Sequence, residues 1–136
     1  MRTLTVLISV SFAVSLTSTA IARELVTVAA PDHVPLYFDP ASVKRDGAKV
    51  SLTYVIDIPK VVDGREVSGA WTSAEVEAVL DCSANTFLVG KLVAHAEARA
   101  QGAVLEVSPP FPGDKPRTIS AKSTWAYLSA QVCKRP

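Results

Sequence analysis

The sequence predicts an α+β domain, in which one C-terminal helix packs on the apolar face of a twisted antiparallel sheet of five or six strands and is tied to it by a disulfide. Three observations lead to this prediction. Segments 49–58 and 70–82 alternate apolar and polar residues with the period of a strand. Segment 120–133 has the period of a helix. The chain has two cysteines, Cys82 and Cys133, which can form only one intramolecular bond.

Residues 1–22 have the features of a secretory signal peptide. Arg2 supplies a positive charge, a mostly apolar stretch follows at 4–16, and Ala20-Ile21-Ala22 is a cleavage motif. Cleavage after this motif leaves residues 23–136, which we expect to form a single domain. The apolar stretch is shorter than the roughly 20 residues of a membrane span, so an uncleaved anchor is the less favoured alternative.

We expect an exported protein, either periplasmic or secreted to the cell surface. No cysteine lies near the cleavage motif, so the sequence predicts that the protein is not a lipoprotein, and no second hydrophobic span follows the leader. The 14 Lys and Arg residues face 13 Asp and Glu residues, and removal of Arg2 with the leader balances them. A net charge near zero argues against nucleic acid and against a purely electrostatic membrane partner.

The first part of the mature chain predicts short extended segments separated by turns. We expect a strand at 24–28 and another at 36–38. Asp39-Pro40 should open a turn, because the residue before a proline is disfavoured in the helical region. Arg45-Asp46-Gly47 should form the next turn, where Gly47 can supply a positive φ.

Two long strands are predicted from the alternation of apolar and polar residues. In segment 49–58 the apolar face holds Val50, Leu52, Tyr54, Ile56 and Ile58. In segment 70–82 the apolar face holds Ala74, Val76, Ala78, Leu80 and Cys82, while Glu75, Glu77 and Asp81 point away. This pattern is typical of antiparallel strands with one buried face.

A three-residue loop at 83–85 should connect segment 70–82 to a return strand at 87–98, with Asn85 in the left-handed conformation. The apolar face of the return strand is predicted to hold Leu88, Leu92, Ala94, Ala96 and Ala98. The opposite face is predicted to hold Lys91, His95, Glu97 and Arg99.

The C-terminal part predicts a last strand, a connector and the helix. Gln101-Gly102 should interrupt the return strand before a short strand at 104–107, and the proline-rich segment 109–116 should be a stiff connector, since proline lacks the amide donor. The apolar stripe of helix 120–133 consists of Ala121, Trp125, Leu128 and Val132. Cys133 lies at the edge of this stripe and is predicted to meet Cys82. In the chain-entropy model, closing this loop contributes roughly 4 kcal/mol.

No group of residues identifies a reaction, and we expect no catalytic residue. Glu75 and Glu77 lie about 6.6 Å apart along a strand, near the spacing at which two carboxylates hydrolyse glycosides. They alternate with small apolar residues, so the solvated side of a strand is the favoured interpretation, with Lys91 as a cross-strand charge partner. An enzyme that uses this pair is the weaker alternative.

His33 and His95 are the two histidines of the chain, which excludes a multi-histidine metal centre. A disulfide between the two cysteines leaves no thiolate for zinc. We therefore expect no metal site and no cofactor, with both histidines exposed to solvent. Haem ligation by one of them stays open as an alternative.

Several motifs follow one another in a distinctive order along residues 24–133. They are Tyr37-Phe38-Asp39-Pro40-Ala41-Ser42-Val43, Gly47, the alternating strand 50–58, Asp81-Cys82, Pro112-Gly113 and the closing Trp125 and Val132-Cys133. Their order resembles the surface-adhesin protein E family of Gram-negative bacteria. The resemblance implies the same sheet with a disulfide-tied helix, an adhesin role toward host matrix proteins, and room for dimerisation and haem binding.

These observations together predict a non-enzymatic exported binding module. It would present a sheet face or a sheet edge to a protein partner, which in an adhesin is a host extracellular-matrix protein. The alternative is a periplasmic protein that binds haem or another small ligand in a groove between helix and sheet.

Overall fold

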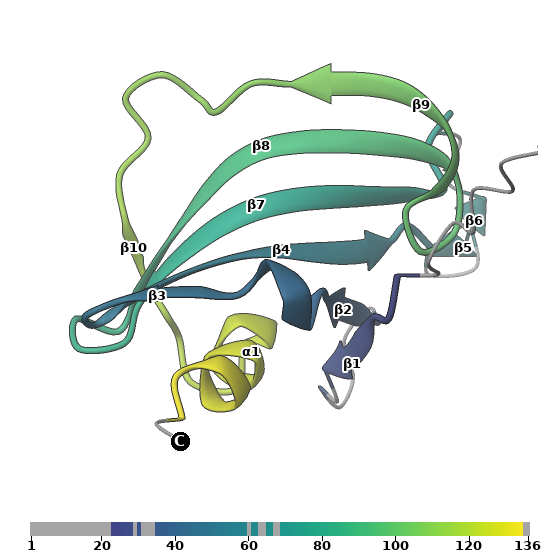
Figure 1. Cartoon of the computed structure of the whole chain (residues 1–136). Coiled ribbons are helices and arrows are strands. Elements are labelled where there is room, and N and C mark those ends of the chain that lie inside the picture. The colour runs from purple at the N-terminus through teal and green to yellow at the C-terminus, as the bar shows by residue number, and fades with distance from the viewer. Residues whose placement is uncertain are drawn as a thin grey trace, which may run out of the picture.

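Figure 1 shows a computed structural model of the chain, which describes residues 23–28, 30, 35–59, 61–62, 65–66 and 69–134. The expected signal peptide and His33 lie outside the described residues. In chain order the elements are β1 (Val26–Val28), β2 (Leu36–Phe38), the 3₁₀ helix η1 (Pro40–Ser42), β3 (Lys44–Asp46), β4 (Lys49–Asp57), β5 (Val61–Val62), β6 (Arg65–Glu66), β7 (Ser73–Asp81), β8 (Thr86–Glu97), β9 (Gln101–Ser108), β10 (Arg117–Thr118) and α1 (Thr124–Val132).

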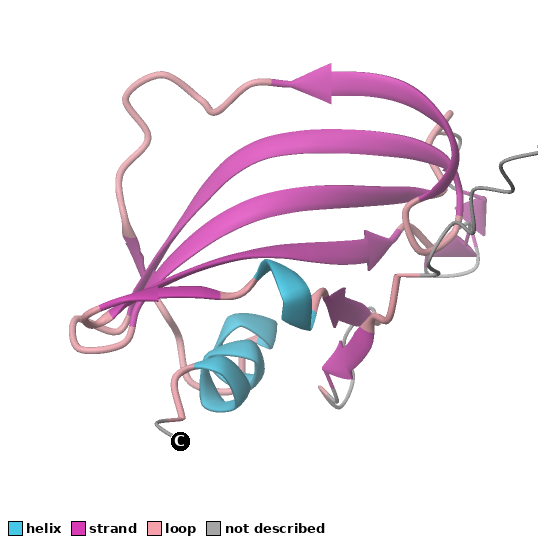
Figure 2. Ribbon diagram, viewed as in Figure 1, coloured by secondary structure: helices cyan, strands magenta, loops and turns pink. Residues whose placement is uncertain are grey.

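One antiparallel sheet dominates the fold. Its strand order is β1-β2-β4-β7-β8-β10, with β3 paired to β4 and β9 paired to β8. Figure 2 shows α1 on one side of this sheet, beneath the arched long strands. The predicted α+β architecture is confirmed. Eight strands of the described chain join the main sheet, more than the expected five or six, because β3 and β10 add short pairings at its margins.

The side of the sheet that faces α1 forms the hydrophobic core. Strands β4 and β7 pair over their whole lengths, which places Val50 opposite Leu80 and Leu52 opposite Ala78. The buried core residues on these two strands are Val50, Leu52, Tyr54, Ala74, Val76, Ala78 and Leu80. The alternation in the sequence therefore predicted the buried face of both strands correctly.

Helix α1 packs on this face through aromatic and aliphatic side chains. The Trp125 ring stacks on Phe87, with centroids 4.1 Å apart, and meets Tyr54 edge to face at 5.1 Å. Leu128 and Val132 are buried beside them. Burial raises the pKa of Tyr54 to about 12, because an ionised phenolate would lose its hydration.

The C-terminal end of α1 is attached to the sheet at two points. Cys133 forms a disulfide with Cys82, with their Cα atoms 5.7 Å apart. Arg45 of β3 donates hydrogen bonds to the carbonyl oxygens of Val132 and Lys134. These contacts fix the end of the helix over the core that its own side chains cover.

The helix begins later than the sequence pattern predicted. The expected range was 120–133, whereas α1 starts at Thr124. Lys122 has a positive φ of 63°, and the Ser123 side chain accepts a hydrogen bond from the backbone amide of Ala126 at 3.2 Å. Ser123 is therefore the N-cap, which ends the irregular segment and starts the helix.

A β-bulge in β8 changes which of its residues face the core. The register pairs Val76 with Leu92 but Ala78 with Val89, so β8 has one extra residue in this interval. Phe87 and Val89 consequently contact the core. The prediction that Leu88 shares the apolar face of Leu92 is wrong, because the extra residue shifts the alternation.

Two further differences concern the hairpin after β8. Strand β9 runs from Gln101 to Ser108 rather than over 104–107, and Gly102 is accommodated in it with a φ of 74°. Arg99 and Ala100 form the turn, each with a φ of 57°. Sequence patterns favour glycine or asparagine for such a turn, so these residues gave no signal.

Replacing both cysteines with serine should lower the free energy of unfolding by about 4 kcal/mol. The reason is that the denatured chain then lacks the cross-link across the 51-residue separation and gains conformational entropy. Urea denaturation followed by tryptophan fluorescence measures this loss. Wild-type protein in a thiol reductant is the control and should lose a similar amount. Equal unfolding midpoints for oxidised wild type and the double variant would contradict the prediction.

Candidate interaction surface

Strand β9 lies at the margin of the sheet (Figure 1). It pairs with β8, and in the described part of the chain no strand pairs with its other edge. The backbone amide and carbonyl groups on that edge can therefore pair with an extended segment from another molecule.

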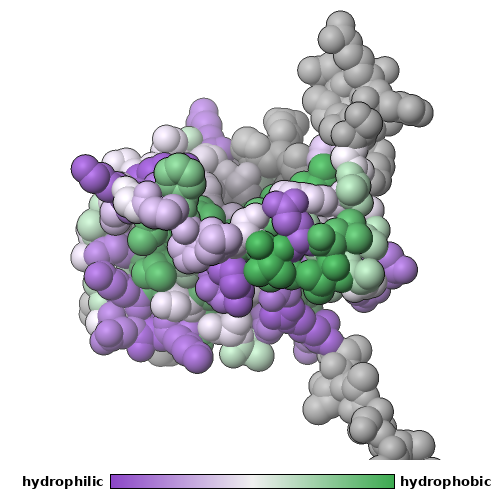
Figure 3. Space-filling model, turned by 90° about the horizontal axis from the view of Figure 1, so that it is seen from above, coloured by the Kyte–Doolittle hydropathy of each residue, from purple (hydrophilic) through white to green (hydrophobic). Residues whose placement is uncertain are grey.

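Apolar side chains accompany this unpaired edge. The exposed fractions are 55% for Val104, 46% for Leu105 and 57% for Val107, and Phe111 on the following connector is 79% exposed. Figure 3 views the molecule from the top of Figure 1 and shows hydrophobic residues gathered near the middle of that surface. Exposed apolar groups beside a free strand edge are typical of a protein-binding surface.

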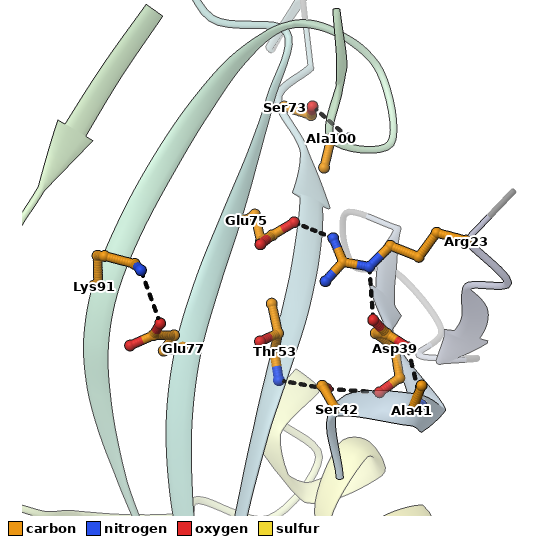
Figure 4. A network of polar contacts seen from close by, with 10 residues as sticks. All are labelled: Arg23, Asp39, Ala41, Ser42, Thr53, Ser73, Glu75, Glu77, Lys91 and Ala100. Carbon is orange, nitrogen blue, oxygen red and sulfur yellow. Dashed lines mark hydrogen bonds and ion pairs between the residues drawn. The ribbon is translucent and has the colours of Figure 1, made fainter. Parts of the chain in front are cut away.

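The face of the sheet opposite α1 is partly covered by the start of the described chain. Arg23 binds two carboxylates, with its Nε atom 2.6 Å from Asp39 and its Nη1 atom hydrogen-bonded to Glu75 (Figure 4). Burial of Arg23 lowers its pKa, but the hydrogen bonds and charges of Asp39 and Glu75 outweigh this and raise it above its usual value.

Asp39 also organises the backbone beside this ion pair. Its other carboxylate oxygen accepts a hydrogen bond from the amide of Ala41 at 2.9 Å, which caps η1. The Ser42 hydroxyl then accepts a hydrogen bond from the amide of Thr53 at 2.8 Å and so joins η1 to β4. The predicted turn at Asp39-Pro40 is thus a capped 3₁₀ helix.

The β8–β9 turn covers the adjacent part of the same face. The Ser73 hydroxyl donates to the carbonyl oxygen of Glu97 and accepts from the amide of Ala100 (2.9 Å). The guanidinium of Arg99 lies 4.6 Å from the centre of the Tyr37 ring, a cation–π contact. As a result, the face opposite α1 has a buried end and an open end.

The structure gives Glu75 and Glu77 separate cationic partners. Glu75 binds Arg23, whereas Glu77 lies 3.1 Å from the ammonium of Lys91 on the neighbouring strand. Figure 4 shows the two carboxylates in these two different contacts. The predicted cross-strand charge pair with Lys91 is confirmed for Glu77, and Glu75 has Arg23 as its charge partner.

His95 is buried, with 8% of its surface exposed, so the prediction that it is exposed is wrong. It lies between Ser73 and Val104 in the sheet, next to the Ser73 hydroxyl that binds the β8–β9 turn. Neither ring nitrogen has a hydrogen-bond partner among the described protein atoms. Sequence patterns indicated neither the length of β9 nor the β8–β9 turn, the two elements next to this side chain.

This position bears on the alternative of a haem-binding groove between helix and sheet. His95 belongs to the face opposite α1, and both of its ring nitrogens are enclosed by protein. His95 therefore does not fit an axial ligand of a group held between α1 and the sheet.

Sequence patterns also missed the exposed edge of β9. The sequence Val104-Leu105-Glu106-Val107 is typical of a half-buried strand and gives no sign of an edge. In the described chain, however, no strand pairs with the outer side of β9. A signal was present in the proline-rich segment that follows. A segment poor in amide donors cannot return as a neighbouring strand, so the preceding strand is left at an edge.

Comparison with known families identifies the chain's relatives. The family described as surface-adhesin protein E matches residues 25–134, nearly the whole described domain. The chain belongs to the surface-adhesin protein E family. No curated protein sequence matches it significantly.

Solved structures of protein E from Haemophilus influenzae share the fold. One has a TM-score of 0.59 at 15% identity, covering 79% of this chain and 83% of the other. A second crystal form has a TM-score of 0.58 at 14% identity, covering 90% of this chain and 96% of the other. A third, from a non-typeable strain, has a TM-score of 0.53 at 14% identity, covering 88% and 81%. At these identities the likeness concerns the fold.

Membership of this adhesin family agrees with a surface or exported location. Among the described residues, no helix has the length and apolar character needed to cross a bilayer.

Replacing His95 with leucine should leave the free energy of unfolding within about 0.5 kcal/mol of wild type, or raise it, because the change removes two buried nitrogens that lack partners. Its neighbour in the register provides the matched control. Ser73→Ala removes two hydrogen bonds from a buried site and should cost about 1–3 kcal/mol. Thermal and urea denaturation compare the two variants, and a larger loss for His95→Leu than for Ser73→Ala would contradict the prediction.

Proposed function

We propose that this protein is an exported, non-enzymatic adhesin that binds a protein partner by pairing an extended segment of that partner with the free edge of β9. The exposed β9 edge and its apolar side chains are the observation that carries the proposal. Membership of the surface-adhesin protein E family supports the adhesin role.

Pairing of this kind divides affinity and specificity between backbone and side chains. The unpaired amides and carbonyls of Gln101–Ser108 supply hydrogen bonds to any extended segment. Val104 and Val107 lie opposite His95 and Val93, on the face away from α1, where they can contact alternate side chains of the added strand. Phe111 extends the apolar area beyond the end of β9.

We propose a host extracellular-matrix protein as the partner, as the resemblance to a surface adhesin implies. The balanced charge of residues 23–136 makes broad electrostatic capture a poor basis for binding, whereas an apolar edge works at physiological salt. A second copy of this chain is a competing occupant of the same edge, because a two-fold axis can pair β9 with itself.

We also infer that the protein is processed after Ala22 and reaches the cell exterior or periplasm without a lipid anchor. The charged, apolar and Ala-x-Ala regions of residues 1–22 support processing, and the absence of a cysteine near residue 23 supports the lack of an anchor.

Expression of the full chain in a Gram-negative host should yield a soluble envelope fraction whose intact mass corresponds to residues 23–136 with one disulfide. Fractionation followed by mass spectrometry under non-reducing conditions measures this. A mass that retains residues 1–22, or that carries an acyl chain, would show that the inferred processing is wrong.

The double substitution Val104→Lys and Val107→Lys should abolish partner binding through β9. Two lysines on an edge strand oppose pairing with another strand, and the exposed positions should keep the change in stability within about 1 kcal/mol. Immobilised protein is exposed to a solubilised host matrix preparation, and the captured proteins are identified and titrated individually. Hydrogen exchange of the complex should then show protection of the β9 amides.

The matched control is Ala130→Lys, which adds a lysine on the exposed side of α1 and should bind like wild type. Analytical ultracentrifugation of the protein without a partner shows whether a second copy of this chain, rather than a matrix protein, occupies the β9 edge. Equal capture by the β9 variant and wild type would refute the proposal, and so would a concentration-dependent dimer that the β9 substitutions dissociate while wild type captures no matrix protein.

A further inference from the structure

A groove of about 600 Å³ lies on the sheet face opposite α1. Strands β4, β7 and β8 form its floor, residues of η1 and β3 line one side, and Pro110 of the β9–β10 connector lines the other. Its volume is within the usual range of small-ligand sites. No residue of β9 lines the groove, so the proposed binding through the β9 edge does not use it.

The groove occupies the part of this face that Arg23 and the β8–β9 turn leave open. Val55, in the covered part, has no exposed surface, whereas Val79 on the groove floor is 36% exposed. Leu88 lies beside Val79 in the register and is half-buried. An apolar floor is therefore accessible from solvent.

The β8 bulge creates this floor. It places Leu88 on the groove side instead of in the core, and it brings Gly90 close to Glu77. A Cβ atom at Gly90 would lie 3.3 Å from the Cβ of Glu77, a tight contact. Glycine at this position thus keeps the space above the strand pair open.

The charges along the groove differ from one side to the other. Glu77 is the acidic residue of the lining, and Lys91 neutralises it at 3.1 Å. Lys44 is exposed on the other side, and its ammonium has no ion pair or hydrogen bond among the described residues. The groove therefore has one cation without a counter-ion, at the β3 side.

Lys44 begins a row of side chains that crosses the sheet. It pairs in register with Ser51, which pairs with Val79, which in turn pairs with Leu88. The row spans four strands, or about 14 Å at the usual strand spacing. It begins with a cation and a hydroxyl, continues with two aliphatic side chains and ends near Pro110.

We propose that this groove binds a linear amphipathic carboxylate. Its carboxylate accepts hydrogen bonds from the Lys44 ammonium and the Ser51 hydroxyl, and its aliphatic chain lies over Val79 and Leu88. Charge complementarity selects the anion, since the acidic lining residue is already paired and Lys44 is not. The apolar floor selects a chain over a compact polar anion such as phosphate.

Titration of the full mature protein with decanoate, below its micelle concentration, tests the proposal. Amide shifts in an NMR titration should concentrate on Lys44, Val79, Leu88 and Gly90. Decanol lacks the charge and should bind about tenfold more weakly, the size expected for one charge-assisted contact. Inorganic phosphate should give no shifts at Val79 and Leu88.

Lys44→Gln should weaken decanoate binding about tenfold and leave decanol binding unchanged. Lys134→Gln makes the same charge change beyond the end of α1 and should bind decanoate like wild type. Equal decanoate affinity in Lys44→Gln and wild type would overturn the proposal, as would shifts centred on α1 or binding that begins only with micelles.

Decanoate binding in the groove should not depend on the β9 edge that is proposed to bind protein partners. The Val104→Lys and Val107→Lys variant should bind decanoate normally, and Lys44→Gln should capture protein partners normally. Loss of decanoate binding in the β9 variant would show that the two surfaces are one site and would overturn the separate groove.

Discussion

Helix α1 and the sheet depend on each other through one buried interface. A nine-residue helix is too short to be stable by itself in water, so its existence requires the apolar face that Trp125, Leu128 and Val132 cover. The sheet in turn would expose the apolar residues of β4 and β7 without this cover. The bond between Cys82 and Cys133 holds the two partners together and limits the freedom of the unfolded chain. This interface buries the α1-facing side chains of β4 and β7, so a partner cannot use that part of the face.

The remaining face is divided by a small set of polar contacts. Arg23 and the β8–β9 turn cover one end, where Val55 and His95 are buried, and the other end stays open as the groove. Because Arg23 is held by both Asp39 and Glu75, this cover links the start of the described chain to η1 and β7. The polar network therefore has a structural explanation, and it also determines where the open surface begins.

The sequence predicted what depends on local alternation and missed what depends on strand pairing. Segments 49–58 and 70–82 showed their buried faces directly, because a strand with one buried face alternates with period two. The bulge in β8 was not predictable in this way, since one extra residue reverses the alternation and becomes visible only against the register of β7. The burial of His95 was missed for a related reason. It depends on a turn built from Arg99 and Ala100, two residues that rarely adopt a positive φ.

Two marginal strands of the sheet, β3 and β9, differ in a way that bears on function. The short margin strand β3 consists of Lys44, Arg45 and Asp46, all exposed and all charged, which is a common protection against unwanted strand pairing. Strand β9 is longer and has one charged residue, Glu106, among exposed aliphatic side chains. A long marginal strand with exposed apolar side chains carries an aggregation risk that a short charged one avoids. Such a risk is consistent with an edge kept available for a partner, and it explains why the adhesin role is assigned to β9 rather than to β3.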